Sequence, residues 1–384
     1  MTDEDLTAVL VDADRYPENP YMSLVAGALE SRGVTVLSPS LPLFFPLTRN
    51  ALRYPEADVL CIDWVYDYYN VSDTGSDALD RAATWVRAAT LLVDLLAVSL
   101  LSVAVVRTVH NERHHEGKYP RTERVVNETV FAVADAVTVK CRAAAERIAA
   151  AYTVPSAAEL HVVPDGSYVS AYENDVSPAT AREELSISEG AFVYLFFGLV
   201  REYKGIPELL AAFGELDVPD AELWVVGSPK SDALGGEIDA LAAGTGNVRT
   251  VLEFVPDERI QYYLNAADVL VLPYRDVLNS GSAHLGCTFG LPVVAPAMGC
   301  LPAALSAAND DLLYDPGAPD GLRRALRRAH EHPDLEGVGR ANYRHAVAND
   351  WPETAERLVA VYRQALERSS AVGAAEPDPF REDA

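Results

Sequence analysis

The stretch FFGLVREYKGIPELLAAF, residues 196–213, has the pattern of a strand, a phosphate-binding turn and a helix. Its apolar run stops at Gly198, and two cations follow at Arg201 and Lys204. Gly205 then precedes a run with helical spacing. Residues that follow a strand of a parallel sheet lie at the ligand-binding edge, and a helix start attracts anions. The stretch therefore predicts an α/β fold with a phosphate site after this strand, and a solvated loop with incidental charges is the alternative.

Strand and helix patterns alternate along the rest of the chain. Short apolar runs predict strands at 6–11, 34–37, 57–63, 103–109, 136–139 and 161–163, and again at 192–197, 222–226, 248–252, 269–272 and 292–295. Segments with helical spacing lie between them, the longest at about 76–96. This alternation is typical of parallel sheets with helices on both faces. We therefore expect two Rossmann-like, doubly wound domains that face a central cleft.

The domain limits follow from composition. A polar, helix-poor stretch near 167–189 is the expected linker, so the first domain is predicted at 1–172 and the second at 173–350. Asp350 is suited to cap a final helix over 351–368. The tail at 369–384 is small, acidic and proline-containing, and this composition predicts disorder.

A second stretch, LPYRDVLNSGSAHLGCTFGLPVVAPAMG at 272–299, predicts another turn before a helix. Gly281 leaves backbone N–H groups accessible, and the hydroxyls of Ser280 and Ser282 flank it. Hydroxyl groups accept or donate hydrogen bonds around a phosphate or a ribose. Alone, the turn is equally typical of a simple N-cap. Together with Arg201 and Lys204 it predicts a diphosphate site.

The charge balance excludes some classes of partner. The 384 residues include 31 Lys and Arg and 57 Asp and Glu, for a net charge of −26. Such a surface repels nucleic-acid phosphates, so we expect no nucleic-acid partner. The acid-rich, lysine-poor composition resembles that of proteins from salt-loving organisms, in which high salt screens the surface repulsion.

Two segments predict where in the cell the protein is located. The stretch MTDEDLTAVLVDADR is acidic and lacks the basic start of a signal peptide. The apolar run 91–106 is too short to span a bilayer and contains Asp94. We expect a buried helix followed by a buried strand, in a cytoplasmic protein. A helix that also touches the inner face of the cell membrane is the alternative.

Several motifs together resemble the donor domain of GT-B glycosyltransferases. They are the KG pair at 204–205, VVG at 225–227, AADVLVLPY at 266–274 and GLPVVA at 290–295. The similarity is closest to family 4, whose members use nucleotide-activated sugars, and covers about residues 190–316. It continues more loosely in the first half, where TVHNERHHEG at 108–117 resembles the family's Thr-x-His segment and VVPDGSY at 162–168 its Pro-Asn-Gly turn. The helix at 351–368 resembles the one that crosses back to the first domain.

The resemblance implies roles for the matching positions. Arg201 and Lys204 would neutralise the donor diphosphate as the nucleotide departs, and His110 would point to the transferred sugar, so these three are the candidate catalytic residues. The implied donor-binding residues are Gly198, Arg201, Lys204, Gly227, Phe254, Val255, Ile260, Tyr274, Ser280, Gly281 and Ser282. The candidate acceptor-binding residues follow first-domain strands and are Asn19, Tyr21, Asn111, Glu112 and His114.

The chain departs from the family pattern at two positions. Many members carry two glutamates eight positions apart, the second of them five residues before the glycine of the GLPVVA-like turn. Val277 and Leu285 stand at these positions. The Ser-Gly-Ser element replaces this arrangement, as in a divergent branch without the paired glutamates. Neither the anomeric outcome nor the donor follows from the resemblance.

The segment HNERHHE at 110–116 has three histidines and two glutamates, a composition found in metal sites. Its spacing is not HExxH, and it follows a strand, so we expect a loop that contacts sugar and acceptor, and no metal. A catalytic metal and a purely structural loop are the alternatives. Asp12 and Asp14 resemble a DxD metal motif of a different transferase fold and are interpreted as incidental. His110 as acid/base and His110 as a hydrogen-bonding group both stay open.

These observations predict a glycosyltransferase of polysaccharide or glycoprotein glycan synthesis. It would move a hexose or hexuronic acid from a nucleotide-diphosphate sugar to a hydroxyl of a saccharide or lipid-linked saccharide, with no further cofactor. A nucleotide-sugar epimerase or hydrolase is one alternative and would consume donor without acceptor. A non-catalytic GT-B scaffold is the other and would bind nucleotide without turnover.

Overall fold

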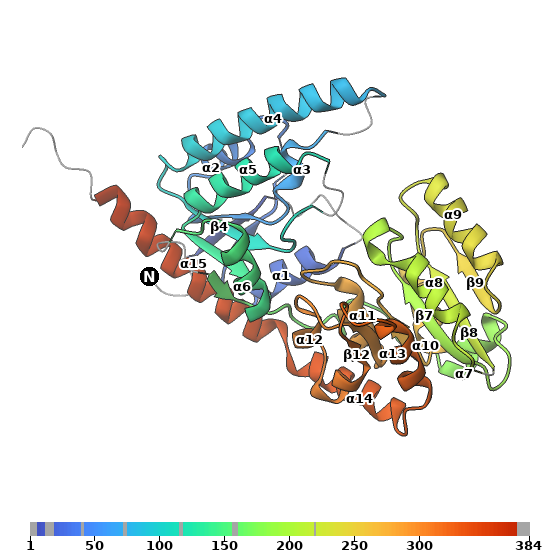
Figure 1. Cartoon of the computed structure of the whole chain (residues 1–384). Coiled ribbons are helices and arrows are strands. Elements are labelled where there is room, and N and C mark those ends of the chain that lie inside the picture. Colours follow the sequence, from blue (N-terminus) through green and yellow to red (C-terminus); the bar gives the residue numbers. More distant parts are fainter. Residues whose placement is uncertain are drawn as a thin grey trace, which may run out of the picture. The chain divides into compact units, whose positions relative to one another are not determined.

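The computed structural model describes residues 6–11, 19–39, 42–71, 75–114, 118–155, 160–218 and 220–374. The chain forms two compact units (Figure 1). Unit 1 comprises residues 1–165 together with 351–384, and unit 2 comprises residues 166–350. In the described ranges each unit is built on one six-stranded sheet, and all the strand pairs are parallel. The predicted α/β class with two Rossmann-like sheets is confirmed.

The sheet of unit 1 has the strand order β2-β1-β3-β4-β5-β6. Its strands are β1 (Thr7–Leu10), β2 (Thr35–Leu37), β3 (Val59–Ile62), β4 (Ala104–Val109), β5 (Ala136–Val139) and β6 (Leu160–Val162). Every residue of β3, β4 and β5 is buried. A parallel sheet with helices on both faces needs apolar side chains in both directions, and this explains the unbroken apolar runs of the sequence.

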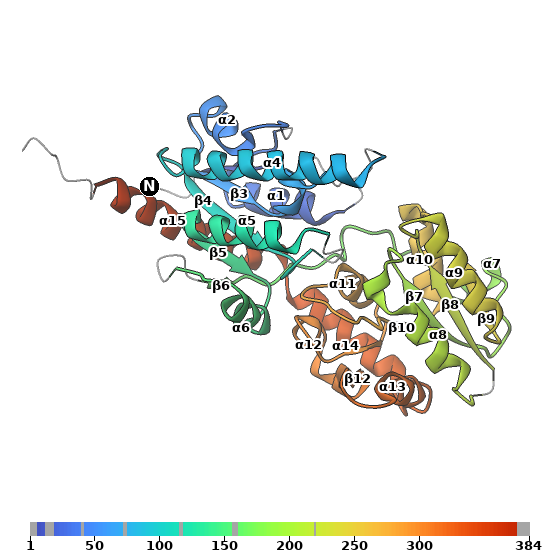
Figure 2. The same ribbon diagram turned by 45° about the horizontal axis from the view of Figure 1, so that its top comes forward.

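Helices cover both faces of this sheet. Figures 1 and 2 show α4 and α5 on one face and α15 on the other. The helix α15 packs against α1, β4 and β5, while α4 packs against α2, α3 and α5. The helices of unit 1 are α1 (Tyr21–Glu30), α2 (Pro46–Arg53), α3 (Tyr66–Tyr69), α4 (Asp77–Val98), α5 (Pro120–Val133), α6 (Arg142–Ala151) and α15 (Trp351–Ala374).

The sheet of unit 2 has the order β12-β11-β10-β7-β8-β9. Its strands are β7 (Phe192–Phe197), β8 (Ala221–Val226), β9 (Val248–Val251), β10 (Val269–Val271), β11 (Val293–Pro296) and β12 (Leu313–Tyr314). Its α-helices are α7 (Pro178–Glu184), α8 (Ile206–Gly214), α9 (Asp232–Ala243), α10 (Asp257–Ala266), α11 (Gly281–Thr288), α12 (Leu301–Ala304), α13 (Gly321–His330) and α14 (Leu335–Ala348). Two 3₁₀ turns occupy Glu202–Lys204 and Ala307–Leu312. The core is centred on β7, where Tyr194, Leu195 and Phe196 are fully buried.

The apolar run 91–106 forms the end of α4 and the start of β4, as predicted. Asp94 is fully buried inside it. Its two carboxylate oxygens accept hydrogen bonds from the backbone N–H groups of Leu47 and Thr48, at 2.8 and 2.9 Å. The acid therefore caps the start of α2 from a distant helix. Across the described residues, none of the helices combines the length and hydropathy needed to cross a membrane.

The structure adds helices that the sequence patterns did not indicate. The helices α2 and α14 were not expected, and α3 lies between the predicted strand at 57–63 and the predicted long helix at about 76–96, where no helix was expected. The last helix continues to Ala374, past its expected end at 368, and 375–384 lie outside the described residues. Two of these elements, α3 and α2, are short, and α2 depends on Asp94 for its cap, so local spacing gives little signal for them.

Candidate functional site

The candidate anion site lies at the point where the strand order of unit 2 reverses. Strands β7 and β10 are neighbours, and the chain proceeds outward from them in opposite directions. Such a reversal leaves a crevice outside the carboxyl ends of the two strands. The loop after β7 carries Arg201 and Lys204, and the loop after β10 carries Tyr274 and leads to Ser280 at the start of α11. Both predicted motifs therefore meet at one edge of the sheet.

A tyrosine links Lys204 to the start of α11. Lys204 Nζ donates a hydrogen bond to the Tyr274 hydroxyl at 2.9 Å and lies 4.2 Å from the centre of that ring. The same hydroxyl is 3.1 Å from Ser280 Oγ. Ser280 in turn caps α11, since its Oγ accepts from the backbone N–H of Ala283. A continuous set of polar contacts thus joins the cation to the helix start.

The contact between Lys204 and Tyr274 shifts the pKa of both groups. Burial alone would raise the pKa of Tyr274, but the adjacent Lys204 ammonium group, together with hydrogen bonds from Lys204, Ser280 and Ser282, holds the pKa below its usual value. Burial would lower the pKa of Lys204, but the oxygens of Tyr274 and Tyr203 raise it. Lys204 therefore keeps its positive charge at this position.

Two glycines allow the turns after β7 and β8 to touch. Gly198 and Gly227 have φ angles of 134° and 142°, in the region that favours glycine. A Cβ atom on Gly227 would lie 1.9 Å from the carbonyl oxygen of Gly198. A Cβ atom on Gly198 would lie 2.8 Å from Ser282 Oγ. The predicted residues Gly198, Gly227 and Ser282 are therefore packed together beside the helix start.

Neither cation of this site has a carboxylate partner among the residues that the structure describes. Arg201 Nη1 donates to the backbone carbonyls of Val200 and Ser228 at 2.9 and 3.3 Å. Elsewhere in unit 2, Arg182 and Arg275 form ion pairs with carboxylates at 2.6 Å. Partly buried cations are normally paired with an anion. Arg201 and Lys204 stand beside a helix N-terminus with no carboxylate partner in the described residues, so they favour an anionic ligand.

The remaining predicted donor residues lie around this site in different environments. Phe254 is exposed and Val255 half-buried in the loop before α10, and Ile260 is a core residue of α10. Gly281 is the first residue of α11, with open space where a Cβ would stand. The positions where many family members have glutamates hold buried apolar side chains, Val277 and Leu285.

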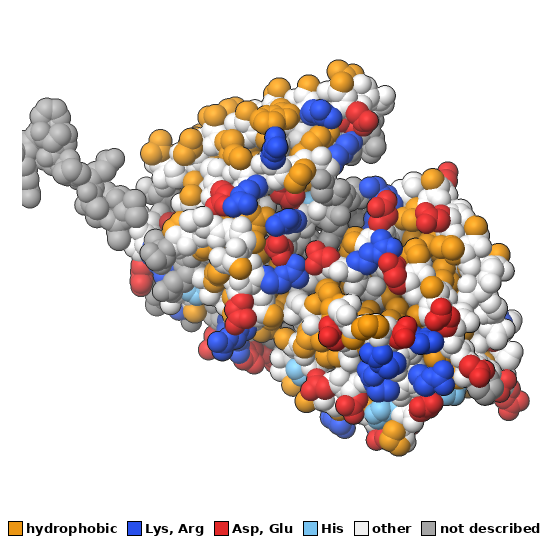
Figure 3. All heavy atoms as spheres, viewed as in Figure 1, with side chains coloured by type: hydrophobic (Ala, Val, Ile, Leu, Met, Phe, Trp, Pro, Cys, Tyr) orange, Lys and Arg blue, Asp and Glu red, His pale blue; other side chains and the backbone are white. Residues whose placement is uncertain are grey.

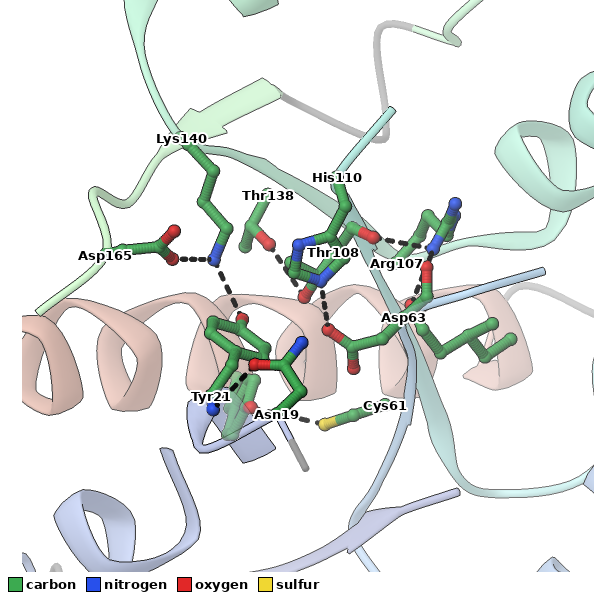
Figure 4. A network of polar contacts seen from close by, with 12 residues as sticks. Asn19, Tyr21, Cys61, Asp63, Arg107, Thr108, His110, Thr138, Lys140 and Asp165 are labelled. Carbon is green, nitrogen blue, oxygen red and sulfur yellow. Dashed lines mark hydrogen bonds and ion pairs between the residues drawn. The ribbon is translucent and has the colours of Figure 1, made fainter. Parts of the chain in front are cut away.

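A second polar cluster lies at the carboxyl ends of β3 and β4 in unit 1 (Figure 4). His110 follows β4 and Asp63 follows β3, and His110 Nε2 is 2.8 Å from Asp63 Oδ1. The Trp64 ring stacks on the imidazole at 4.7 Å between centroids, and the Tyr21 ring meets it edge-on at 4.8 Å. His110 is only 9% exposed. Two rings and one carboxylate therefore fix the orientation of the imidazole.

A buried arginine fixes the backbone that carries Asp63. Arg107 Nη1 donates to the carbonyl oxygens of Ile62, Asp63 and Thr108 (Figure 4). Because Arg107 lies in the middle of β4, it ties the start of the Asp63 loop to the strand that ends at His110. The pair is thus held by the sheet itself.

Lys140 and Asp165 form an ion pair on the other side of Tyr21. Lys140 Nζ lies 2.6 Å from Asp165 Oδ1 and donates to the Tyr21 hydroxyl at 2.8 Å. The backbone N–H of Tyr21 donates to Asn19 Oδ1 at 3.1 Å (Figure 4). The predicted residues Asn19 and Tyr21 are therefore part of the same network as His110.

The environment of His110 leaves the imidazole neutral. Burial lowers the pKa of His110 below its usual value, and the hydrogen bond to Asp63 opposes this only in part. Because the carboxylate accepts, we assign the proton to Nε2, and Nδ1 then carries the lone pair. Within the described part of the chain, Nδ1 of His110 has no hydrogen-bond donor. It is thus suited to accept a hydrogen bond or a proton from a hydroxyl group.

The loop after His110 is attached to neighbouring elements. Glu112, one residue after the half-buried Asn111, forms an ion pair with Arg147 of α6 at 2.6 Å. His114 stacks on the ring of Tyr66. The side chains of Glu112 and His114 therefore already have partners inside unit 1.

Comparison with known proteins agrees with this geometry. Residues 191–332 match the family model described as glycosyl transferases group 1. The D-inositol 3-phosphate glycosyltransferase of Segniliparus rotundus is 29% identical over 285 residues, which are 72% of this chain and 63% of that protein. The match thus spans less than two thirds of the relative's length.

Two solved structures have the same fold over nearly the whole chain. Sucrose-phosphate synthase from Thermosynechococcus elongatus has a TM-score of 0.71 at 18% identity, covering 97% of this chain and 99% of its own. HepE of Anabaena, solved in complex with UDP and glucose, has a TM-score of 0.67 at 14% identity, covering 92% and 98%. The chain has the GT-B fold, and residues 191–332 match the glycosyl transferases group 1 family. The family 4-like resemblance predicted from the motifs is confirmed.

In this GT-B chain, the sequence patterns did not single out Asp63, Lys140 or Asp165 as site residues. Each of the three follows an apolar strand run, in CIDW, VTVK and VVPD. Asp63 and Lys140 come directly after the buried strands β3 and β5, and Asp165 comes three residues after β6. Charged residues that follow parallel strands lie at the ligand-binding edge, so this signal was present in the sequence.

The described residues contain no group of three or more His, Cys, Asp or Glu side chains placed to hold a metal ion. His115 and Glu116 of the histidine-rich segment lie outside the described residues, as do Asp12 and Asp14.

Proposed function

We propose that the chain is a glycosyltransferase that moves a hexose or hexuronic acid from a nucleotide-diphosphate sugar to a hydroxyl of a saccharide or lipid-linked saccharide. One observation carries the proposal: Arg201 and Lys204 have no carboxylate partner in the described ranges and stand beside a helix start. Unit 2 is thereby assigned to the donor. Unit 1, with the His110 cluster, is assigned to the acceptor.

Arg201 and Lys204 act on the leaving group. When the bond to the sugar breaks, negative charge builds on the diphosphate, and cations that are already in place stabilise it. Ser280, Gly281 and Ser282 hold the phosphates or ribose where the dipole of α11 favours an anion. The other residues assigned to the donor are Gly198, Gly227, Phe254, Val255, Ile260 and Tyr274. Because two side chains supply the positive charge, the proposal needs no metal or other cofactor.

His110 acts on a hydroxyl group, either of the transferred sugar or of the acceptor. Its neutral imidazole offers Nδ1 as an acceptor, and Asp63 is a positioning residue that fixes the tautomer and the ring orientation. The residues assigned to the acceptor side are Asn19, Tyr21, Asn111, Glu112 and His114. Of these, Tyr21 contacts the His110 ring directly.

The donor class and the location are part of the same proposal. HepE is solved with UDP and glucose, so a UDP-hexose is the first donor to test. The net charge of −26 disfavours a nucleic-acid partner. We place the reaction in the cytoplasm, at the inner face of the cell membrane when the acceptor is lipid-linked.

The test measures release of nucleoside diphosphate from UDP- and GDP-sugars at high salt, with and without a pool of saccharide acceptors. Lys204→Ala should lower kcat by two to three orders of magnitude, on the scale of losing one preorganised donor to a developing anion. The matched control is Arg340→Ala, because Arg340 pairs with Glu336 on the exposed side of α14.

Each contrary result has a distinct meaning. Release of nucleoside diphosphate without an acceptor would identify a hydrolase, and conversion of the donor sugar without that release would identify an epimerase. Nucleotide binding without turnover against any acceptor would identify a scaffold. Near-normal turnover by Lys204→Ala would remove the proposed mechanism.

A further inference from the structure

The helix α4 exposes a stripe of apolar side chains along its length. Six large apolar residues are between 55% and 85% exposed on α4 and in the turn after it: Leu79, Trp85, Val86, Val93, Leu96 and Leu100. At 100° per residue they fall on one side of the helix, opposite the buried residues Thr84, Leu91 and Val98. We call them the α4 stripe. Soluble proteins rarely expose a contiguous apolar surface of this kind unless something covers it.

The neighbouring helix α2 extends this apolar surface. Leu43, Phe44, Phe45 and Leu52 are also exposed, in α2 and directly before it. The two helices pack together, and the bonds from Asp94 to the start of α2 fix one against the other. Figure 3 shows hydrophobic side chains gathered over this part of unit 1. The surface is therefore built on two rigid helices that are fixed to each other.

The charges around the stripe are the reverse of those of the whole chain. The chain has 57 acidic and 31 basic residues, yet between Arg81 and Leu101 the one acid is Asp94, which is fully buried. The exposed charges of α2 are Arg49 and Arg53, and near the start of α4 Arg81 is exposed together with Asp77, which pairs with Lys118 at 3.9 Å. None of these three arginines has a carboxylate partner in the described ranges. An apolar stripe bordered by uncompensated cations complements a surface of phosphate groups over hydrocarbon.

The same charges disfavour a second copy of the chain as the cover. A symmetric dimer uses the same patch on both subunits, which would bring these arginines toward their own copies. Phosphate headgroups instead neutralise them. An exposed tryptophan also suits the boundary between headgroups and hydrocarbon. Because α4 is not apolar enough to cross a bilayer, it would lie on the surface.

We propose that the α4 stripe and the exposed residues of α2 dock unit 1 on an anionic lipid bilayer. The stripe enters the boundary between headgroups and hydrocarbon, and Arg49, Arg53 and Arg81 contact lipid phosphates. The net charge of −26 opposes approach to the same lipids over long distances, but the Debye length is about 8 Å at physiological salt and about 3 Å at 1 M. Docking therefore persists at high salt, where the apolar contact remains and the long-range repulsion is screened. This inference does not depend on the proposed transfer reaction.

The test is sedimentation of the full chain with vesicles of phosphatidylglycerol and phosphatidylcholine, and with phosphatidylcholine alone. The wild-type chain should bind the anionic vesicles at least tenfold more strongly than the neutral ones. Val93→Glu combined with Leu96→Glu should reduce that binding at least tenfold. Val347→Glu, at an exposed apolar position of α14 in the other unit, is the matched control and should bind like wild type. Circular dichroism of each variant checks that the fold is intact.

Tryptophan emission reports which surface is in contact. Trp85 is exposed, whereas Trp224 and Trp351 are buried and Trp64 is half-buried. Anionic vesicles should shift the wild-type emission to the blue, and Trp85→Phe should abolish the shift while the protein still sediments. Three results would overturn the proposal: no binding to anionic vesicles, equal binding by the Val93/Leu96 variant, or a lipid-free dimer that this variant converts to a monomer.

Discussion

The pairing of Asp63 with His110 gives a prediction with a defined size. Asp63→Asn replaces a buried hydrogen bond to a charged acceptor, about 1.5–3 kcal/mol, by a neutral one of about 0.5–1.5 kcal/mol. His110 Nε2 lies 2.8 Å from Asp63 Oδ1, so the amide oxygen of the variant can accept in the same place. The net loss of hydrogen-bond free energy is then about 1–2 kcal/mol. If this free energy helps to position the imidazole in the transition state, its loss raises the barrier by the same amount and kcat drops about 5- to 30-fold.

The same substitution shifts the pH dependence in a known direction. The Asp63 hydrogen bond raises the pKa of His110 against the lowering effect of burial. A neutral amide gives a weaker hydrogen bond and no negative charge, so the pKa of His110 falls further and the acid limb of the kcat/KM profile moves to lower pH. A residue with a purely structural part in the fold would not move this limb.

The assay is the pH profile of kcat and kcat/KM, measured beside a stability-matched control. Asp135→Asn serves as that control, because the Asp135 carboxylate accepts from the backbone N–H of Val105 at the other end of β4, at 2.8 Å. It should lose stability but keep kcat and the acid limb. Unchanged kcat and an unchanged acid limb in Asp63→Asn, or the same changes in both variants, would refute the reasoning.

Three further predictions concern stability. Gly227→Ala should lower the free energy of unfolding by about 3 kcal/mol or more, since its Cβ would meet the Gly198 carbonyl oxygen at 1.9 Å. The control Gly236→Ala, in open space on α9, should not lower the Tm, and equal melting temperatures of the two variants would contradict the prediction. Asp94→Asn should lower the free energy of unfolding by about 1–3 kcal/mol, because it weakens the cap of α2. The control Asp77→Asn, with its side chain 90% exposed, should leave that free energy unchanged in chemical denaturation. Dialysis to low salt should unfold the chain, because unscreened repulsion among charges that sum to −26 opposes the compact state; a circular-dichroism spectrum indifferent to salt would count against this.

The elements that the sequence predicts well are those with a local cause. The strands β7 and β8 are apolar runs because both of their faces are covered, so composition alone indicates them. The meeting of Lys204 with Ser280 also follows from the pattern, since both lie in connections that follow strands, and parallel strands share one ligand-binding edge. The link between them through the Tyr274 hydroxyl depends on a side-chain direction that no spacing rule gives.

The features that the sequence does not predict depend on distant partners. His110 and Asp63 meet because β3 and β4 are neighbours, and the order of strands in a sheet is not a local property. The helix α2 has few apolar residues and is fixed by Asp94, more than forty positions later in the chain. A helix that is stabilised by one tertiary contact leaves little trace in its own sequence.

The most direct test of the central claim compares how UDP and uridine bind to the wild-type chain and to the Arg201→Ala/Lys204→Ala variant, by isothermal titration calorimetry at high salt. Two charge-assisted hydrogen bonds of about 1.5 kcal/mol each amount to about 3 kcal/mol, so UDP should bind the variant at least a hundredfold more weakly. Uridine, which has no phosphate, should bind both proteins equally. Equal affinities of UDP for the two proteins would contradict the assignment of these cations to the diphosphate.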